Sequence, residues 1–229
     1  TIHPRDAFFG GRTEGFKTYH KCQGQEKIFY HDVVSLYPTV NALDDYAVGF
    51  NRYVNDLKIE NIANGKFFGL VKVDIIPPKD LYVPVLPDRT QNKLLFHVNE
   101  MKEKTFTSIE LKLALEKGYK ITKVYAALEY KKYTGLMKDY VEFFLKMKIQ
   151  NNKQYSQEEC DRINKSHQQL GLNIHINPED TLKNPGMKAL AKLCLNSLWG
   201  KFGQRTQLDS FDYFSQWNKL LAMLTNEKT

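Results

Sequence analysis

The first half of the chain carries a hydrophobic pattern that predicts β-strands. Residues 26–34 and Phe67–Ile76 are rich in β-branched and aromatic side chains, and the second segment stops at Pro77. Proline cannot donate a hydrogen bond to a neighbouring strand, so a strand ends there. The predicted strands are residues 26–34, which run into a turn at Pro38, Phe67–Ile76, Leu94–Val98 and Ile121–Tyr130.

Helical spacing and helix-capping signals dominate the second half. Ser108–Glu116 is followed by a glycine stop, and Leu136–Ile149 repeats apolar residues at the helical period. Ser156 and Glu159 form a capping-box pattern that opens a polar helix through about Leu170. Strands and helices are therefore mixed without strict alternation, which predicts an α+β fold.

The clearest helix signals lie between Asn184 and Gly203. Asn184 is a favourable N-cap with a proline directly after it, and glycines near the far end offer stops. Lys188, Lys192 and Asn196 recur every four residues, so they share one face of the helix. The predicted apolar side consists of Met187, Leu190, Ala191, Cys194 and Leu198. A surface helix with solvated lysines would look similar, but it does not explain the run Asn-Ser-Leu-Trp-Gly-Lys-Phe-Gly beyond the lysines.

Composition and charge narrow the classes of function. The chain has 229 residues, of which 42% are hydrophobic and 13% aromatic, so broad disorder is disfavoured. Its net charge of +7 and pI of about 9.1 favour a polyanionic partner, although solubility alone can account for such a charge. No Gly-x-x-x-x-Gly-Lys phosphate loop is present, which disfavours a P-loop NTPase.

Targeting and redox signals point to an intracellular protein without assigning a compartment. No apolar run approaches the roughly 18–20 residues of a membrane-spanning helix. The first residues lack the apolar core of a signal peptide, so secretion is not expected, and the missing initial methionine suggests a start inside a longer protein. The three cysteines are too widely spaced for a disulfide framework or a zinc site.

One acidic residue stands where a strand meets a turn. Asp32 is followed by Val-Val-Ser-Leu-Tyr-Pro, and its carboxylate could present hard oxygen ligands to Mg²⁺. The turn from Ser35 to Pro38 would expose backbone amides to a phosphate. Taken alone, an aspartate in this position is more often a cap or a turn residue.

Two segments together resemble a known family. Asp32-x-x-Ser-Leu-Tyr-Pro resembles motif A of the family-B DNA polymerases, and Lys192-x-x-x-Asn-Ser-x-Trp-Gly resembles their motif B. The motifs occur in the family's order, with Lys192 160 positions after Asp32. A reverse transcriptase or an RNA polymerase also has a palm aspartate, but neither is expected to carry the Ser-Leu-Tyr-Pro turn.

The finer resemblance is to the protein-primed branch, found in small phages, linear organellar plasmids and Maverick/Polinton-type transposons. Phe8-Phe9-Gly10-Gly11 resembles the Tyr-x-Gly-Gly element of that branch, and Thr134–Tyr140 resembles the end of its insertion that contacts terminal protein. Two positions depart from the pattern. Trp199 stands where the commoner motif B has tyrosine, and Phe8 replaces the tyrosine of the Gly-Gly element.

The resemblance implies a DNA polymerase that works by two-metal phosphoryl transfer. It assigns Asp32 and Lys192 as catalytic residues, with Asp32 and the Val33 carbonyl as ligands of two Mg²⁺ ions. It also implies nucleotide contacts from Ser35, Leu36, Tyr37, Lys188, Lys192 and Asn196, with Tyr37 beneath the sugar. Implied DNA contacts are Gly10, Gly11, Arg12, Lys201 and Arg205. Lys148 is a further candidate phosphate contact, ahead of an apparent insertion.

The same resemblance implies a division of the chain. The expected parts are a palm portion with motif A over 1–100, a terminal-protein-type insertion with a return to the palm over 101–150, fingers with motif B over 151–205, and the start of a further palm segment over 206–229. The expected partners are template-primer DNA, deoxynucleoside triphosphates and a terminal protein primer, and no membrane.

The family's motif C, Tyr-x-Asp-Thr-Asp-Ser, does not occur in the sequence. The 229-residue chain itself is therefore expected not to extend a primer. An alternative from another class is a non-catalytic nucleic-acid-binding remnant of a decayed mobile element.

Overall fold

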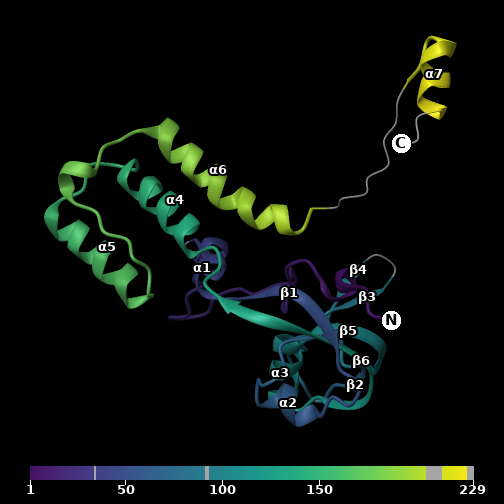
Figure 1. Ribbon diagram of the computed structural model, residues 1–229. Coiled ribbons are helices and arrows are strands. Elements are labelled where there is room, and N and C mark those ends of the chain that lie inside the picture. The colour runs from purple at the N-terminus through teal and green to yellow at the C-terminus, as the bar shows by residue number, and fades with distance from the viewer. Residues whose placement is uncertain (34, 91–92, 205–212, 226–229) are drawn as a thin grey trace.

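The computed structural model describes residues 1–33, 35–90, 93–204 and 213–225 (Figure 1). Most of its helices and strands fall into two units, one built around a β-sheet and one built from helices. The elements in chain order are η1 (Pro4–Ala7), α1 (Leu36–Leu43), β1 (Asp45–Tyr53), α2 (Ile59–Ala63), β2 (Gly69–Ile76), β3 (Asp88–Thr90), β4 (Lys93–Leu95), β5 (Met101–Thr107), α3 (Ser108–Glu116), β6 (Lys120–Thr134), α4 (Lys138–Gln150), α5 (Gln157–Gln169), η2 (Pro178–Asp180), α6 (Pro185–Phe202) and α7 (Trp217–Leu224).

The first unit, called here the sheet unit, comprises residues 45–134. Its four strands pair antiparallel in the order β1-β6-β2-β5, and β3 pairs with β4 in a separate ribbon. Val71, Val73 and Ile75 alternate along β2 and are fully buried. They pack in one core with side chains of α2 and α3, including Ile62 and Leu111. Alternation of this kind places one face of the sheet against covering helices.

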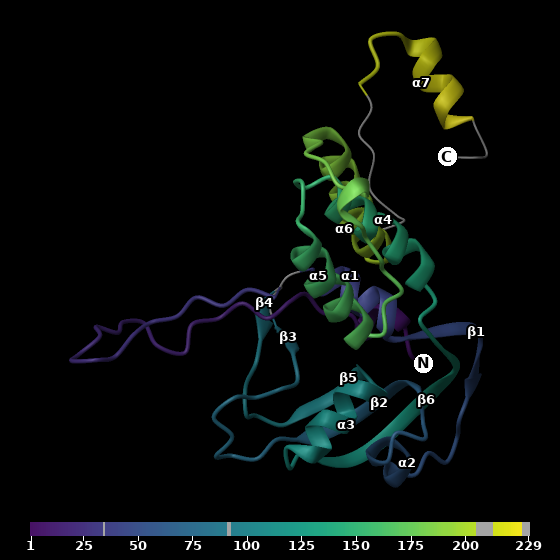
Figure 2. The ribbon, with the colours of Figure 1, turned by 90° about the vertical axis from the view of Figure 1, so that its left-hand side faces the viewer.

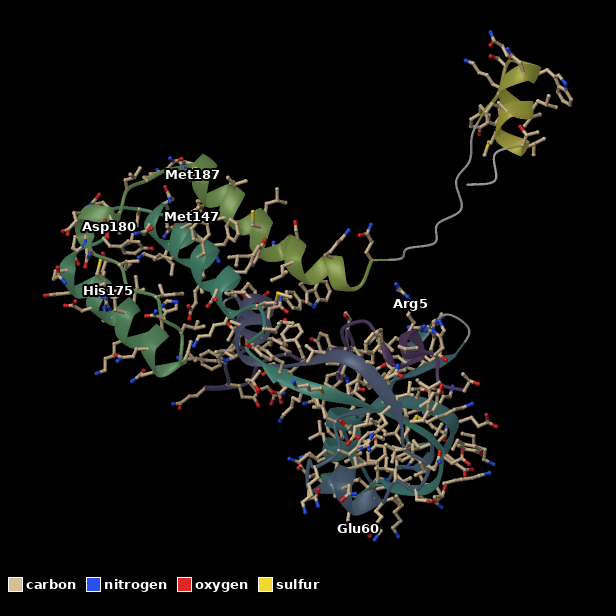
Figure 3. The ribbon with its side chains drawn as sticks, viewed as in Figure 1. Arg5, Glu60, Met147, His175, Asp180 and Met187 are labelled. Atoms are coloured by element: carbon tan, nitrogen blue, oxygen red, sulfur yellow. The ribbon has the colours of Figure 1, made fainter. Side chains whose placement is uncertain are left out.

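The second unit, called here the helical unit, is built from α1, α4, α5 and α6. Its core joins Ala42 of α1, Val141 and Leu145 of α4, Cys160 of α5 and Leu195 of α6. α4 packs against both α1 and α6, and α1 lies near the start of α4 (Figures 1 and 2). Figure 3 draws the side chains and labels Met147 on α4 and Met187 on α6.

The sheet unit is inserted into the helical unit, between α1 and α4. Its first and last residues are strand partners, since Asp45 of β1 pairs with Thr134 of β6. Just outside them, the Gly135 amide donates a hydrogen bond to the Asp44 carbonyl at 3.1 Å. The chain thus leaves α1 and returns to α4 at one place. The expected division of the chain at residues 100, 150 and 205 separates parts by their functional role, whereas the two units described here are separated by packing. The expected division therefore stays a prediction.

The four predicted helices and two of the predicted strands are confirmed. α3 has the expected bounds, and the Ser156–Glu159 capping box forms in full at the start of α5. The Asn184 side chain accepts a hydrogen bond from the Met187 amide at 3.1 Å, as expected of an N-cap. β2 and β6 match the predicted strands Phe67–Ile76 and Ile121–Tyr130. The α+β class is therefore correct.

Three predictions about elements are wrong or incomplete. Residues 26–33 form no strand, and Tyr30 is 93% exposed, because none of the strands in the described part of the chain pairs with this segment; residue 34 of the predicted strand lies outside the described residues. The predicted strand Leu94–Val98 is reduced to the short β4. On α6 the buried leucine is Leu195, whereas Leu190 is half exposed. The elements not predicted are η1, α1, β1, α2, β3, β5, η2 and α7.

Among the residues that the structure describes, no helix combines the length and the apolar character needed to cross a membrane.

Candidate functional site

The turn after Asp32 is held in an unusual backbone conformation. Ser35, at the N-cap of α1, has φ +56° and ψ +36°, which is the left-handed region that residues with a Cβ seldom adopt. Both the amide and the hydroxyl of Thr39 donate to the Ser35 carbonyl at 3.0 Å. The Ser35 side chain does not cap α1. The Ser35 side chain therefore does not occupy the first amides of α1, and amides at a helix N-terminus can bind anions.

Lys148 of α4 is fixed against this turn. Its ammonium donates to the Ser35 hydroxyl at 3.1 Å, across 113 positions of sequence. Burial lowers the pKa of Lys148, and the positive charges of Lys192 and Lys188 lower it further. Among the described residues Lys148 has no carboxylate partner, so its charge close to two other ammonium groups is costly, and a bound anion would offset that cost. The geometry therefore favours a negatively charged ligand beside Ser35.

The α6 helix brings Lys192 and Asn196 to the same place. They lie one helical turn apart, and Leu195 between them is buried in the core of the helical unit, which sets the rotation of the helix. The pocket that results has a volume of about 490 Å³. It is lined by His31, Asp32, Val33, Ser35, Leu36, Tyr37, Pro38, Lys148, Lys192, Leu195 and Asn196.

Most of the residues predicted to bind nucleotide or metal thus meet in one pocket. Lys188 is the exception, since its ammonium donates to the Asn152 side chain at 2.7 Å in an adjoining pocket. The prediction that Lys188 and Lys192 share one helix face holds only loosely, because the two line different pockets.

An aromatic pair borders the pocket. The Tyr37 and Trp199 rings stack with centroids 4.6 Å apart and planes 26° apart. Each side chain remains about half exposed. Trp199 stands where the resembled family more often has tyrosine, so its larger ring covers more of the Tyr37 face. The stack links the turn after Asp32 to the far end of α6.

Four of the residues predicted to contact DNA are described by the structure, and none of the four lines this pocket. Gly10 and Gly11 are exposed, and a Cβ added at either would meet nothing within 4 Å. The Arg12 guanidinium is already engaged by Glu14 at 2.8 Å and lies over the Phe96 ring at 4.2 Å. The Lys201 ammonium donates to the Gln204 side chain at 2.6 Å. Arg205 lies outside the described residues. These assignments remain predictions.

The pocket offers part of a metal site. Asp32 is the acidic residue in its lining, and the neighbouring Val33 backbone is close by. Across the described ranges, no cluster of three or more His, Cys, Asp or Glu side chains could hold a metal ion. A carboxylate and a carbonyl suit Mg²⁺, which takes its remaining ligands from water, phosphates or other carboxylates. The donor set therefore fits this ion as a partial shell.

Comparison with family models identifies the chain. The model of DNA polymerase type B, organellar and viral, matches residues 3–167. The chain belongs to this family. The match includes the turn after Asp32 and the sheet unit, but it ends before α6. The position of Lys192 beside Asp32 is therefore an observation independent of the family match.

Solved polymerase structures resemble the chain at low identity. Phi29 DNA polymerase in complex with primer-template DNA and incoming nucleotides is 19% identical, with a TM-score of 0.45, over 75% of this chain and 25% of that one. Phi29 DNA polymerase in complex with single-stranded DNA is 21% identical, with a TM-score of 0.48, over 76% and 25%. The chain thus spans about a quarter of these structures. Comparison with curated proteins gave no match.

Sequence reasoning named Lys148 only as a further candidate phosphate contact, and it did not name His31 as a site residue. Lys148 has one local signal in the sequence, because it lies one residue before the end of the predicted helix Leu136–Ile149. Its role depends on α4 packing against α1, which no local pattern reveals. His31 lines the pocket through its position next to Asp32.

Proposed function

We propose that the chain forms the nucleotide-binding part of a DNA-directed DNA polymerase that adds deoxynucleotides to a primer 3′-hydroxyl. The observation that carries the proposal is the convergence of Asp32, Ser35, Lys148 and Lys192 in one pocket, from segments far apart in sequence. In a complex with a metal-bound triphosphate, the carboxylate would hold the metal ion and the ammonium groups would bind the phosphates. A decayed, non-catalytic remnant would have no need to keep both.

The residues would divide the work as follows. The Ser35 and Leu36 backbone and the Lys148 and Lys192 ammonium groups would bind triphosphate oxygens, and Asn196 would border the nascent base pair. In the reaction the 3′-oxygen bonds to the α-phosphorus, its proton passes to solvent, and the bond to the β-phosphate breaks to release pyrophosphate. Positioned cations stabilise the charge that develops on the phosphates.

Asp32 and the Val33 carbonyl would hold magnesium. The ion, when bound, would supply Lewis-acid activation of the phosphate and lower the pKa of the attacking hydroxyl. This pair is only part of a two-ion site, so further carboxylates are required. For that reason we expect the 229-residue chain alone not to extend a primer.

DNA and a protein primer complete the proposal. Gly10 and Gly11 would allow template backbone to approach closely, since glycine has no Cβ. Arg12, Lys201 and Arg205 would contact phosphates. The resemblance of residues 134–140 to the protein-primed branch supports a terminal protein as primer.

Lys192→Ala tests the nucleotide assignment. In a version of the protein lengthened to include motif C, we expect the KM for all four deoxynucleotides to rise by about tenfold or more, because one charge-assisted contact contributes roughly 1.5–3 kcal/mol. Steady-state primer extension measures this. Lys183→Ala, which removes an exposed lysine just before α6, is the matched control and should leave KM unchanged. An effect restricted to one base, or none, would contradict a triphosphate contact.

Tyr37→Val tests sugar discrimination. The Tyr37 ring is placed by its stack on Trp199, and in the proposed role it leaves no room for a 2′-hydroxyl. We expect the ratio of ribonucleotide to deoxynucleotide incorporation to rise by at least about tenfold in the variant. The smaller valine would no longer exclude the 2′-hydroxyl by steric clash. Competition between the two nucleotide types in primer extension measures the ratio. An unaltered ratio would remove Tyr37 from this role.

A further inference from the structure

The segment of residues 8–33 is exposed almost throughout. Across this range, which the structure describes in full, Phe9 and Arg12 are the two partly buried residues. Gly10 and Gly11 lie between them and are exposed, and a Cβ added at either would meet nothing within 4 Å. The position of the two glycines therefore depends on what holds the residues on either side of them.

Arg89 of β3 contacts the residues that precede the glycines. Its guanidinium donates a hydrogen bond to the Phe8 carbonyl at 3.0 Å, and it lies over the Phe9 ring, 5.5 Å from the ring centre. A cation over the face of an aromatic ring is attracted to it. The Phe9 ring also stacks on the fully buried Phe106 of β5, with ring centres 6.1 Å apart. Arg89 thus contacts both the backbone and the side chain directly before Gly10.

Arg12 makes the reverse arrangement on the other side of the glycines. Its guanidinium donates a hydrogen bond to the Pro84 carbonyl and lies over the Phe96 ring, 4.2 Å from the ring centre. Pro84 lies shortly before β3, and Phe96 directly follows β4. The β3–β4 ribbon therefore sends one arginine to the segment, and the segment sends one arginine to the ribbon. Gly10 and Gly11 span the gap between these two contacts.

The β3–β4 ribbon is itself tied to the sheet. Asp88, the neighbour of Arg89, forms an ion pair with the Lys104 ammonium of β5 at 2.6 Å, and its side chain is only 10% exposed. Leu86, two residues earlier, is buried in the core of the sheet unit. A buried ion pair is strongly destabilised when one partner is removed, so it holds its two strands in register. Arg89 therefore reaches the exposed segment from a strand whose own position is fixed.

We propose that Arg89 is a positioning residue that holds Gly10 and Gly11 toward the template strand. The inference rests on the proposed function, in which the two glycines contact template backbone. A Gly-Gly pair has more conformational freedom than other dipeptides, so an unanchored pair loses more of it on binding DNA. Contacts on both sides remove part of that freedom beforehand, and such preorganisation raises affinity. The sheet unit would thereby strengthen a DNA contact that lies outside it.

Trypsin cleavage after Arg12 tests the contact without DNA. The protease takes an arginine side chain into its own specificity pocket, so Arg12 must first leave the ribbon. Arg89→Met keeps a long aliphatic side chain but removes the hydrogen-bond donor and the charge. We expect cleavage after Arg12 in the 229-residue chain, measured by mass spectrometry, to become at least about fivefold faster. Arg89→Lys, which retains a charged donor, should lie between the two.

Two controls separate opening of the segment from a general loss of structure. Arg52→Met removes an arginine of β1 that pairs with Glu129 of β6, and it should leave cleavage after Arg12 unchanged. Cleavage after Lys123, within β6, should be equal in Arg89→Met and in the unmodified chain, because only the segment opens. Unchanged cleavage after Arg12 in Arg89→Met overturns the proposal, as does an equal rise after Lys123.

Binding of primer-template DNA distinguishes positioning from a direct phosphate contact. Fluorescence anisotropy with the 229-residue chain measures the affinity over a range of salt concentrations. If Arg89 positions the glycines, Arg89→Met weakens binding with an unchanged salt dependence, and it has little further effect in the Gly10→Ala background. If Arg89 itself contacts a phosphate, the slope of log affinity against log salt decreases in magnitude by about 0.9, and the two substitutions act independently. That result overturns the proposal.

Failure of the proposed function gives a different result. Unchanged DNA affinity of Gly10→Ala would contradict the template contact of the glycines, whatever the rate of cleavage after Arg12. Unchanged KM in Lys192→Ala would contradict the polymerase assignment itself, and neither result depends on Arg89.

Discussion

Replacing Asp32 by asparagine should abolish nearly all nucleotide addition in a version of this protein that includes motif C. Asparagine keeps the size of the side chain and its capacity to accept hydrogen bonds, but it removes the anionic ligand. Asp32 is the acidic residue in the lining of its pocket, so no neighbour in that lining can replace it. We expect turnover to fall by at least about 10³, the scale of losing a major electrostatic contribution to the transition state.

Single-turnover primer extension with magnesium measures this effect. The matched control is Asp44→Asn, the same change at the exposed C-cap of α1, which should retain activity. The unextended 229-residue chain serves as a second comparison and should be inactive. Near-normal extension by Asp32→Asn would mean that Asp32 is a structural turn residue and that the catalytic carboxylates lie elsewhere. Activity of the short chain would lead to the same conclusion.

Replacing Gly69 by alanine should disrupt the sheet unit. A Cβ at this position would lie 1.9 Å from the Leu128 carbonyl oxygen, an atom of the paired strand β6. The obstacle is backbone, so no side-chain rotation can relieve it and the two strands must separate. We expect the free energy of unfolding to fall by about 3 kcal/mol or more, in the range of severe overpacking.

Urea unfolding followed by circular dichroism measures the change. Gly10→Ala is the matched control, because a Cβ there meets nothing within 4 Å, and its effect should stay within about 0.5 kcal/mol. Equal stability of the two variants would contradict the close approach of β2 and β6 at Gly69.

The elements that sequence predicted well are those with local signals. α5 and α6 each begin at a local capping signal in which the side chain of the N-cap residue accepts a hydrogen bond from an amide three residues later. These signals are the Ser156–Glu159 capping box and the Asn184 cap. The strand β5 was missed because it is an edge strand with a sequence of alternating lysines and glutamate, Met-Lys-Glu-Lys-Thr-Phe-Thr. The sequence pattern does not predict α1, because it indicates a turn at Pro38. It lies in the first helical turn, where proline is tolerated.

The candidate site likewise contains residues that local motifs predict and residues that they do not. The turn after Asp32 and the face carrying Lys192 and Asn196 were predictable from two short motifs. The contact of Lys148 with Ser35 was not, because it depends on how α4 packs against α1 in the helical unit. Packing across such separations leaves no periodic trace in the sequence.

The meeting of Asp44 and Gly135 has a consequence for the entropy of the chain. While the sheet unit is folded, it joins α1 to α4 like a short link, because its two ends are strand partners. Once it unfolds, the same segment becomes a loop of about 90 residues, and closing such a loop costs about 4 kcal/mol against roughly 1 for a tight turn. Residues far from Asp32 therefore help to hold Ser35 against Lys148 simply by keeping two chain ends together.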